Sequence, residues 1–164
     1  MPHDAVIRDI APTDTEACVR IALVAWAPIF ESFREMLGDE LFQVLRPDWR
    51  QTKAAEIRNG CTGAGGAMAL VATVGGEVVG FVTFRCDQER HVGQVGNNAV
   101  DPDFQGRGIA PRLYKHALDR MRALGMKVAM VQTGGDPSHA PARRAYEKAG
   151  FTARVTWADY YQKL

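Results

Sequence analysis

The chain has 164 residues, of which 46% are hydrophobic and 24% are charged. This length and mixture are typical of one globular domain, so we expect residues 1–164 to form a single domain with a substantial core. The formal net charge of +1 argues against nucleic acid or a membrane surface as a partner. The longest apolar run, residues 21–30, is too short to span a bilayer. We therefore expect a cytoplasmic protein.

The cysteines add to this picture. Cys18, Cys61 and Cys86 are odd in number and lack CxxC spacing. This pattern argues against a disulfide framework or a metal site, and it favours buried free thiols in a reducing compartment.

The first 60 residues predict one strand and several helices. Residues 5–10 are typical of a short strand, and a Thr-Asp-Thr-Glu capping box at residues 13–16 opens a helix. We expect Pro28 to end or kink this helix, and a second helix to cover residues 29–37. Further helical stretches begin at Asp39 and Gln51. The aromatic side chains here favour a core, although Glu31, Asp39 and Glu40 could wall a cleft for a cationic ligand.

The middle of the chain predicts antiparallel strands. Three β-rich runs follow one another: residues 68–74, 77–84 and 91–100. The first two are joined by Gly75-Gly76, a two-residue hairpin turn. Gly93 and Gly96 lie inside the third run, where glycine indicates a bulge or a close approach of another group.

The last third alternates helices and strands. Apolar positions at helical spacing follow Gly108, and then come a strand over residues 127–133, a helix over 141–149 and a last strand over 151–157. The order predicts an α/β fold: a mixed, mostly antiparallel central sheet of about six to seven strands with helices on both faces.

The segment VDPDFQGRGIAPRLY, residues 100–114, has the features of an anion site. A glycine-bearing turn leads into a helix whose first N–H groups have no intrahelical acceptors. Together with the helix dipole, these donors suit a phosphate. Gly106 and Gly108 let an anion approach the backbone closely. A tight loop that uses its glycines only for turning is the alternative.

A second motif, HAPARRAYEKAGF, spans residues 139–151. Together with QGRGIA at residues 105–110, it resembles the GNAT superfamily of N-acetyltransferases. The family's pyrophosphate loop is Q/R-x-x-G-x-G/A, and its next helix commonly reads N-x-x-A-x-x-x-Y-x-x-x-G-F. The resemblance extends from about Val71 to Phe151 and is weak in the N-terminal helices.

The resemblance implies acetyl-CoA as the co-substrate, with no metal. It implies that the backbone N–H groups of the loop hold the pyrophosphate, that Val100 lines the pantetheine arm, and that the strands near Val100 and Val131 splay apart. The cofactor contacts implied in this way are Val100, Gln105, Gly106, Arg107, Gly108, Ile109, Ala110, His139 and Tyr146. His139 stands where the family often has asparagine. Arg107, Arg112 and Arg143 could also reach phosphates or be solvated.

Tyr146 resembles the general acid of the family. The leaving thiolate has a pKa near 8.5, and a tyrosine with a pKa near 10 can donate a proton while remaining un-ionised at pH 7. The alternative is an aromatic side chain that packs between helix and sheet.

The general base is not identified by the sequence. Residues 94–98, QVGNN, contain no carboxylate, although some relatives place a glutamate on this strand. A water ordered by Asn97 or Asn98 could accept the proton, as could Glu31 or His91. Asn98 is therefore the second candidate catalytic residue, with a plain strand position as the alternative.

The resemblance implies transfer of an acetyl group from acetyl-CoA to a primary amine, by direct attack in a ternary complex. A non-catalytic acyl-CoA-binding sensor or interaction module is the competing interpretation, and a site for another nucleotide is a third. The acceptor is not indicated, and a homodimer is one expected state because dimers are common in the family.

Overall fold

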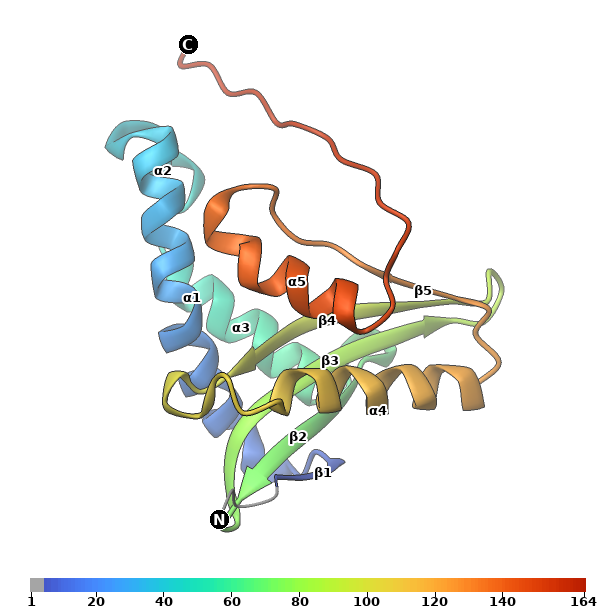
Figure 1. Ribbon diagram of the computed structural model, residues 1–164. Coiled ribbons are helices and arrows are strands. Elements are labelled where there is room, and N and C mark those ends of the chain that lie inside the picture. Colours follow the sequence, from blue (N-terminus) through green and yellow to red (C-terminus); the bar gives the residue numbers. More distant parts are fainter. Residues whose placement is uncertain (1–4) are drawn as a thin grey trace.

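The computed structural model describes residues 5–164. Its centre is a five-stranded sheet with strand order β1-β2-β3-β4-β5 (Figure 1). The strands are β1 (Val6–Asp9), β2 (Met68–Val74), β3 (Glu77–Asp87), β4 (Val92–Val100) and β5 (Val128–Val131). Neighbouring strands are antiparallel except for the parallel pair β4–β5. The mixed, mostly antiparallel sheet is confirmed, with fewer strands than predicted.

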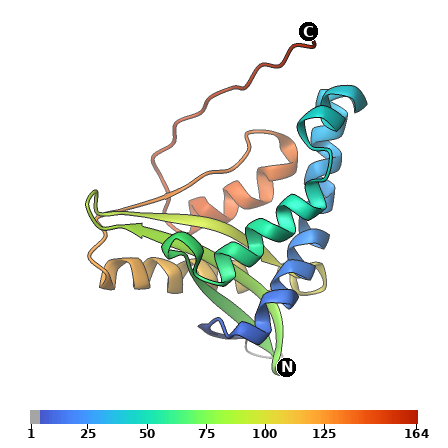
Figure 2. The ribbon, with the colours of Figure 1, turned by 180° about the vertical axis from the view of Figure 1, so that it is seen from behind.

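Helices cover both faces of the sheet. The helices are α1 (Thr15–Leu37), α2 (Asp39–Leu45), α3 (Trp49–Cys61), α4 (Ile109–Ala123) and α5 (Ala140–Lys148). In Figure 1, α4 and α5 lie in front of the strands, and in Figure 2 α1 and α3 lie in front of the opposite face. Each face therefore has a helical layer of its own.

The alternation of side chains along the strands supplies one apolar layer to each helical layer. Val71 and Phe81 pack with the α1 and α3 side chains Ile21 and Ile57. The opposite core joins the strand residues Leu70, Val82, Phe84 and Val95 to the α4 residues Leu113 and Met121. Because successive strand residues point to opposite faces, both layers are filled from the same strands.

The N-terminal helix differs from the prediction, because α1 runs through Pro28 without a break. A proline in a helix removes one N–H and leaves the carbonyl four residues earlier without its donor. Here Pro28 and Val24 are both exposed, so this part of the helix lies on its solvent side, where water can serve the carbonyl. The prediction of two separate helices was therefore wrong. Helix α1 begins at Thr15, after the turn Pro12–Asp14.

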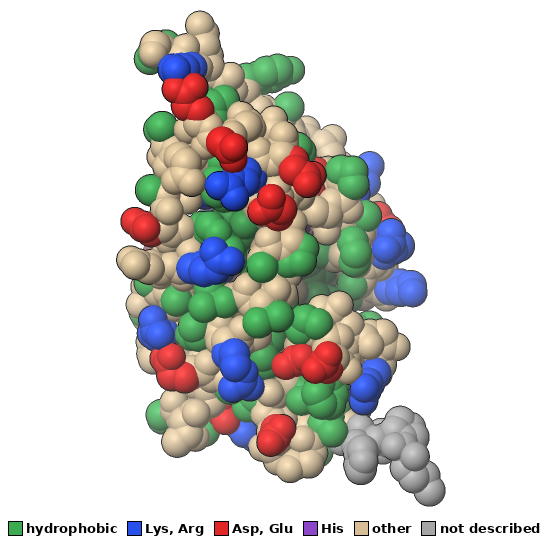
Figure 3. Space-filling view, turned by 90° about the vertical axis from the view of Figure 1, so that its left-hand side faces the viewer, with side chains coloured by type: hydrophobic (Ala, Val, Ile, Leu, Met, Phe, Trp, Pro, Cys, Tyr) green, Lys and Arg blue, Asp and Glu red, His purple; other side chains and the backbone are tan. Residues whose placement is uncertain are grey.

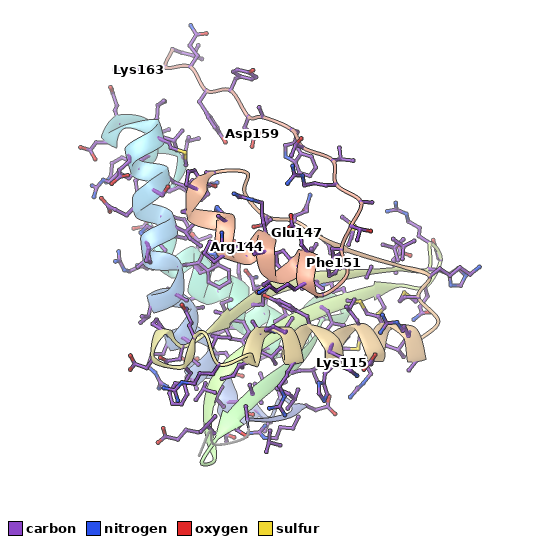
Figure 4. The ribbon with its side chains drawn as sticks, in the orientation of Figure 1. Lys115, Arg144, Glu147, Phe151, Asp159 and Lys163 are labelled. Atoms are coloured by element: carbon purple, nitrogen blue, oxygen red, sulfur yellow. The ribbon has the colours of Figure 1, made fainter. Side chains whose placement is uncertain are left out.

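The predicted strand over residues 151–157 is also wrong. The chain has no regular secondary structure after α5, and it leaves the sheet at Phe151, which packs edge-on against Tyr146 at 6.0 Å between ring centroids. Val155 and Trp157 are 82% and 67% exposed, so the alternating apolar side chains of this segment cover no core. Near its far end, Lys163 pairs with Glu40 of α2 (Figure 4).

The three cysteines are free thiols. Cys18 and Cys61 are buried where α1 and α3 pack together, and the neighbouring Cys61 thiol, together with burial, raises the pKa of the Cys18 thiol. This is the environment expected from the sequence, and Cys86 is half-buried. No helix within residues 5–164 combines the length and the apolar character that a membrane crossing requires. Acidic and basic side chains are interspersed on the side of the molecule shown in Figure 3.

Candidate functional site

The site begins where β4 and β5 separate. The two strands pair only from Val92–Val128 to Val95–Val131. Beyond this point a cavity of about 430 Å³ lies between them, within the usual size range of small-molecule sites. The predicted splay of these strands is confirmed. The cavity is lined by Ala25, Trp26, Ile29, Lys53, Gln94, Val95, Gly96, Asn97, Asn98, Ala99, Val100, Gln105, Gln132, Thr133, His139, Ala142 and Tyr146.

A β-bulge shapes the floor of this cavity. Val95 pairs with Phe84 and Asn98 pairs with Val82, so Gly96 and Asn97 together lie opposite Thr83. A Cβ at Gly96 would come within 2.7 Å of the Thr83 hydroxyl, which donates a hydrogen bond to the Asn97 carbonyl. The bulge predicted at Gly96 is confirmed, and it requires glycine because no space remains for a side chain.

Asn97 and Asn98 point to opposite faces of the sheet. Asn97 accepts a hydrogen bond from Lys53 of α3, with 3.3 Å between the Lys53 Nζ and the Asn97 Oδ1. Asn98 bonds to side chains of α4 and α5 instead. Two adjacent residues therefore connect the cavity to both helical layers.

Asn98 joins two buried tyrosines. Its Nδ2 donates to the Tyr146 hydroxyl at 3.0 Å and to the Gly96 carbonyl at 3.1 Å. Its Oδ1 accepts from the Tyr114 hydroxyl at 2.7 Å. The rings of Tyr114 and Tyr146 also pack together, with 5.2 Å between centroids. Because the Tyr146 oxygen accepts from Asn98, its own hydrogen is free to be donated elsewhere.

Burial keeps both tyrosines protonated. Tyr146 is only 7% exposed, and desolvation raises the pKa of its hydroxyl, although the hydrogen bond from Asn98 opposes this rise. Burial also raises the pKa of Tyr114. At neutral pH the cavity is thus bordered by a phenol that can act as a proton donor.

The glycine loop lies at one end of the cavity. Gly106 and Gly108 have φ values of 74° and 75°, in the left-handed region that favours glycine. Gly108 is the N-cap of α4, so the N–H groups of Ile109 and Ala110 have no intrahelical acceptor. Pro111 lies in the first turn, where its missing N–H costs no helix hydrogen bond. These groups form a backbone cradle of the kind that binds phosphates.

Other side chains brace this loop. The Gln105 Nε2 donates to the Val100 carbonyl at 3.0 Å, which ties the loop to the end of β4. Arg107 donates to the Asp103 carbonyl and lies over the Phe104 ring. Arg143 braces a different loop, the one before α5, by donating to the carbonyls of Gly134 and Asp136. The guanidinium groups of Arg107 and Arg143 are therefore already bonded within the protein and are not free to bind a phosphate.

His139 forms a buried pair with Asp136 at the start of α5. The His139 Nδ1 lies 2.6 Å from the Asp136 Oδ1, and their side chains are 12% and 10% exposed. The hydrogen bonds from Ser138 and His139 lower the pKa of Asp136 against the effect of its burial. With a carboxylate accepting at Nδ1, this nitrogen carries a proton, and in the neutral imidazole Nε2 is then the acceptor.

Several predicted site residues are not brought to the cavity. Glu31 and His91 are exposed and do not line it, so neither is placed to act as its base. Asp39 pairs with Arg34, and Glu40 pairs with Lys163. The acidic residues of α1 and α2 therefore do not wall this cavity, which corrects the expectation of a cleft for a cationic ligand.

The sequence does not single out Tyr114, Asp136 or Lys53 as site residues. Tyr114 had a detectable signal, because it follows Leu113 and precedes Ala117 by one helical turn on the inner side of α4. Asp136 and Lys53 had none, since their roles depend on contacts formed only by folding.

Comparison with known proteins decides the family. The model of the acetyltransferase (GNAT) family matches residues 27–151, more than half of the chain. The chain belongs to the GNAT family. The resemblance seen in the two sequence motifs is therefore confirmed.

Curated relatives of this GNAT chain match shorter stretches. A mycothiol acetyltransferase of Sanguibacter keddieii is 36% identical over 88 residues, which cover 51% of this chain and 27% of that protein. A ribosomal protein bS18-alanine N-acetyltransferase of Salmonella typhimurium is 35% identical over 65 residues, 40% of this chain and 43% of that protein. The chain thus spans less than half the length of these two relatives.

Solved structures share the GNAT fold over nearly the whole chain. The PaiA N-acetyltransferase of Thermoplasma acidophilum, in complex with coenzyme A, superposes with a TM-score of 0.74 at 16% identity. The match covers 93% of this GNAT chain and 92% of that structure.

Proposed function

We propose that this chain transfers the acetyl group of acetyl-CoA to an amine, by direct attack within a ternary complex. Membership of the GNAT family supports the reaction class. The observation that carries the proposal is the position of the Tyr146 hydroxyl, held by Asn98 in the cavity where β4 and β5 separate. A proton donor, an unpaired strand edge and a phosphate cradle therefore meet in one place.

The residues present fit coenzyme A. The backbone N–H groups from Gly106 to Ala110 would hold the pyrophosphate, because the left-handed glycines leave the cradle free of side chains. Val100 and the β4 edge beyond Val95 would line the pantetheine arm, since this edge has no β5 partner. The co-substrate supplies the thioester, and the chain positions it.

His139 belongs to the proposed cofactor contacts as a hydrogen-bond acceptor. The asparagine common at this position can both donate and accept through its side chain. With Nδ1 bonded to Asp136, the free Nε2 of a neutral His139 accepts only. It would therefore receive an amide N–H of the pantetheine arm.

Asn98 and Tyr146 have distinct roles in the proposed transfer. Asn98 orients the phenol by donating to its oxygen, which directs the phenol hydrogen into the cavity. As the amine nitrogen bonds to the acetyl carbon and the C–S bond breaks, Tyr146 donates its proton to the departing thiolate, and burial keeps the phenol from ionising before that point at neutral pH. The nitrogen loses its proton to water, and a proton from water restores the phenol. Holding the amine and the thioester together provides much of the remaining acceleration.

Thermal unfolding with acetyl-CoA tests the cofactor site directly. Ligand at about 100 times its dissociation constant adds about 2.7 kcal/mol of stability. For a domain of this size we expect Tm to rise by about 5–10 °C, with no comparable rise for ATP or NAD. No shift at millimolar acetyl-CoA would refute the proposed site.

Thiol release then separates the enzyme from its competitor. A transferase releases coenzyme A when acetyl-CoA is mixed with a suitable amine, whereas an acyl-CoA-binding module shows the thermal shift without turnover. The absence of Asp and Glu from the described residues that line the cavity is the observation that keeps the second interpretation in view.

A further inference from the structure

Lys53 is the basic side chain of the cavity wall. The described residues that line the cavity include no Asp, Glu or Arg, and Lys53 is the lysine among them. A cavity built for a polycationic acceptor would be expected to offer carboxylates. This cavity offers an ammonium group instead.

Lys53 is held rigidly at the cavity wall. Its side chain is 14% exposed, and its Nζ lies 4.7 Å from the centre of the Trp26 ring. The Nζ also donates to the Asn97 Oδ1 at 3.3 Å and to the Glu56 Oε2 at 2.6 Å. An ammonium has three donors, so one remains for a ligand.

Asn97 provides a second donor beside the first. Its Oδ1 faces Lys53, and its Nδ2 has no hydrogen-bond partner among residues 5–164. An ammonium and an amide N–H next to each other match the two oxygens of one carboxylate. Both groups are already fixed by neighbouring side chains, so binding orders little more of the chain.

The position of Lys53 assigns this pair to the acceptor. The glycine loop and Tyr146 belong to α4 and α5, which cover one face of the sheet. Lys53 and Trp26 belong to α3 and α1 on the other face. Asn97 also directly precedes Asn98, which holds Tyr146. The ammonium is thus close to the proposed reacting group, but on the side opposite the cofactor cradle.

We propose that Lys53 and Asn97 select an acceptor that carries a carboxylate as well as the amine, such as an amino acid. This inference rests on the proposed acetyl transfer. The carboxylate binds the Lys53 ammonium and the Asn97 amide, and the amine then points toward the cavity floor at Asn98. A purely cationic amine lacks this anchor and finds no carboxylate among the described residues that line the cavity.

Matched acceptor pairs test the proposal on the full chain. Alanine, leucine and phenylalanine are each compared with their amides, which keep the amine and lose the carboxylate charge. We expect kcat/KM with acetyl-CoA to be at least tenfold higher for an acid than for its amide. Lys53→Met should bring the ratio close to one, mainly by raising KM for the acid, and Lys53→Arg should retain part of the preference.

Lys115→Met is the matched control. Lys115 is an exposed lysine of α4 that pairs with Asp119, far from the lining of the cavity. Its replacement should leave the ratio unchanged. An equal loss of kcat/KM for acids and amides in Lys53→Met would assign Lys53 to structure and overturn the proposal, as would a wild-type preference for the amides.

A binding measurement keeps this inference separate from the proposed reaction. Leucine should raise the Tm of the coenzyme A-bound wild type and should not raise that of coenzyme A-bound Lys53→Met. Absence of a rise in the wild type, at leucine concentrations up to tens of millimolar, overturns the carboxylate site whatever the turnover. Absence of turnover with every acceptor, while the leucine-dependent rise persists, refutes the acetyl transfer and leaves the carboxylate site supported.

Discussion

Replacement of Tyr146 by phenylalanine separates chemistry from packing. The change removes one oxygen and leaves a ring that still contacts Tyr114 and Phe151. The Asn98 Nδ2 carries two N–H groups: one keeps the Gly96 carbonyl at 3.1 Å, and the other loses the Tyr146 oxygen. Because Asn98 is only half-buried and lines the cavity, water can replace the lost acceptor, and we expect the free energy of unfolding to change by about 1 kcal/mol.

The rate should change far more than the stability. Loss of a general acid typically costs a factor of about 10² to 10⁴, and a factor of 100 corresponds to about 2.7 kcal/mol of transition-state stabilisation. We expect kcat to fall at least 100-fold and KM for acetyl-CoA to stay within about threefold, because the hydroxyl acts on the leaving group.

Thiol release and urea unfolding measure the two effects. Tyr160→Phe is the control, because Tyr160 lies in the C-terminal segment and is 93% exposed. It should retain both wild-type values. A Tyr146→Phe enzyme with full kcat would refute the assignment of Tyr146 as the acid, and an equal loss of stability and rate would assign it to packing.

Two further changes test the cradle and the N-terminal turn. Gly108→Ala should cost about 1–2 kcal/mol of stability because of its positive φ, and it should weaken acetyl-CoA binding about tenfold. Gly125→Ala is the control: Gly125 has a φ of 83° at the far end of α4, so this change should lower stability alone. Tm measures the stability, and titration with acetyl-CoA measures the binding. Asp14→Asn should lower the free energy of unfolding by about 1.5–3 kcal/mol at pH 7. The reason is that the hydrogen bonds from Arg8 favour the ionised Asp14 carboxyl in the folded state and so lower its pKa. The stability that Asp14 contributes is present above its ordinary pKa near 3.9 and is lost as the pH falls through the lowered folded-state pKa. Urea unfolding should therefore show the difference in stability between wild type and Asp14→Asn shrinking toward pH 2. A difference that is independent of pH would contradict the ion pair, and an unchanged acetyl-CoA affinity in Gly108→Ala would contradict the cradle.

Local signals predicted the parts of the fold that depend on neighbours in the chain. Gly106 and Gly108 marked the loop because their backbone conformation favours glycine, and the spacing of apolar residues marked α4 because one face of that helix is buried. Gly96 marked the bulge for a related reason, since Thr83 leaves no room for a Cβ. In each case the residue type alone was enough to predict the local structure.

The remaining features depend on contacts between distant segments. Pro28 reads as a break, yet α1 continues because the carbonyl that loses its donor is on the exposed side of the helix. Residues 151–157 alternate like a strand, but alternation does not reveal whether a partner strand is present. Likewise the hydrogen bond between Lys53 and Asn97 joins residues 44 positions apart, so no local sequence pattern predicts it.

The bulge at Gly96 and Asn97 has a consequence for how new specificities arise. The proposed donor site is concentrated in the segment from β4 to α5, whereas the opposing wall comes from α1 and α3, which precede the first hairpin in the chain. The two sets of residues meet across one irregular strand and where Phe33 of α1 contacts His139. Substitutions at the lining positions of the N-terminal helices, away from Phe33, are therefore expected to change the proposed acceptor wall while leaving the proposed donor site in place.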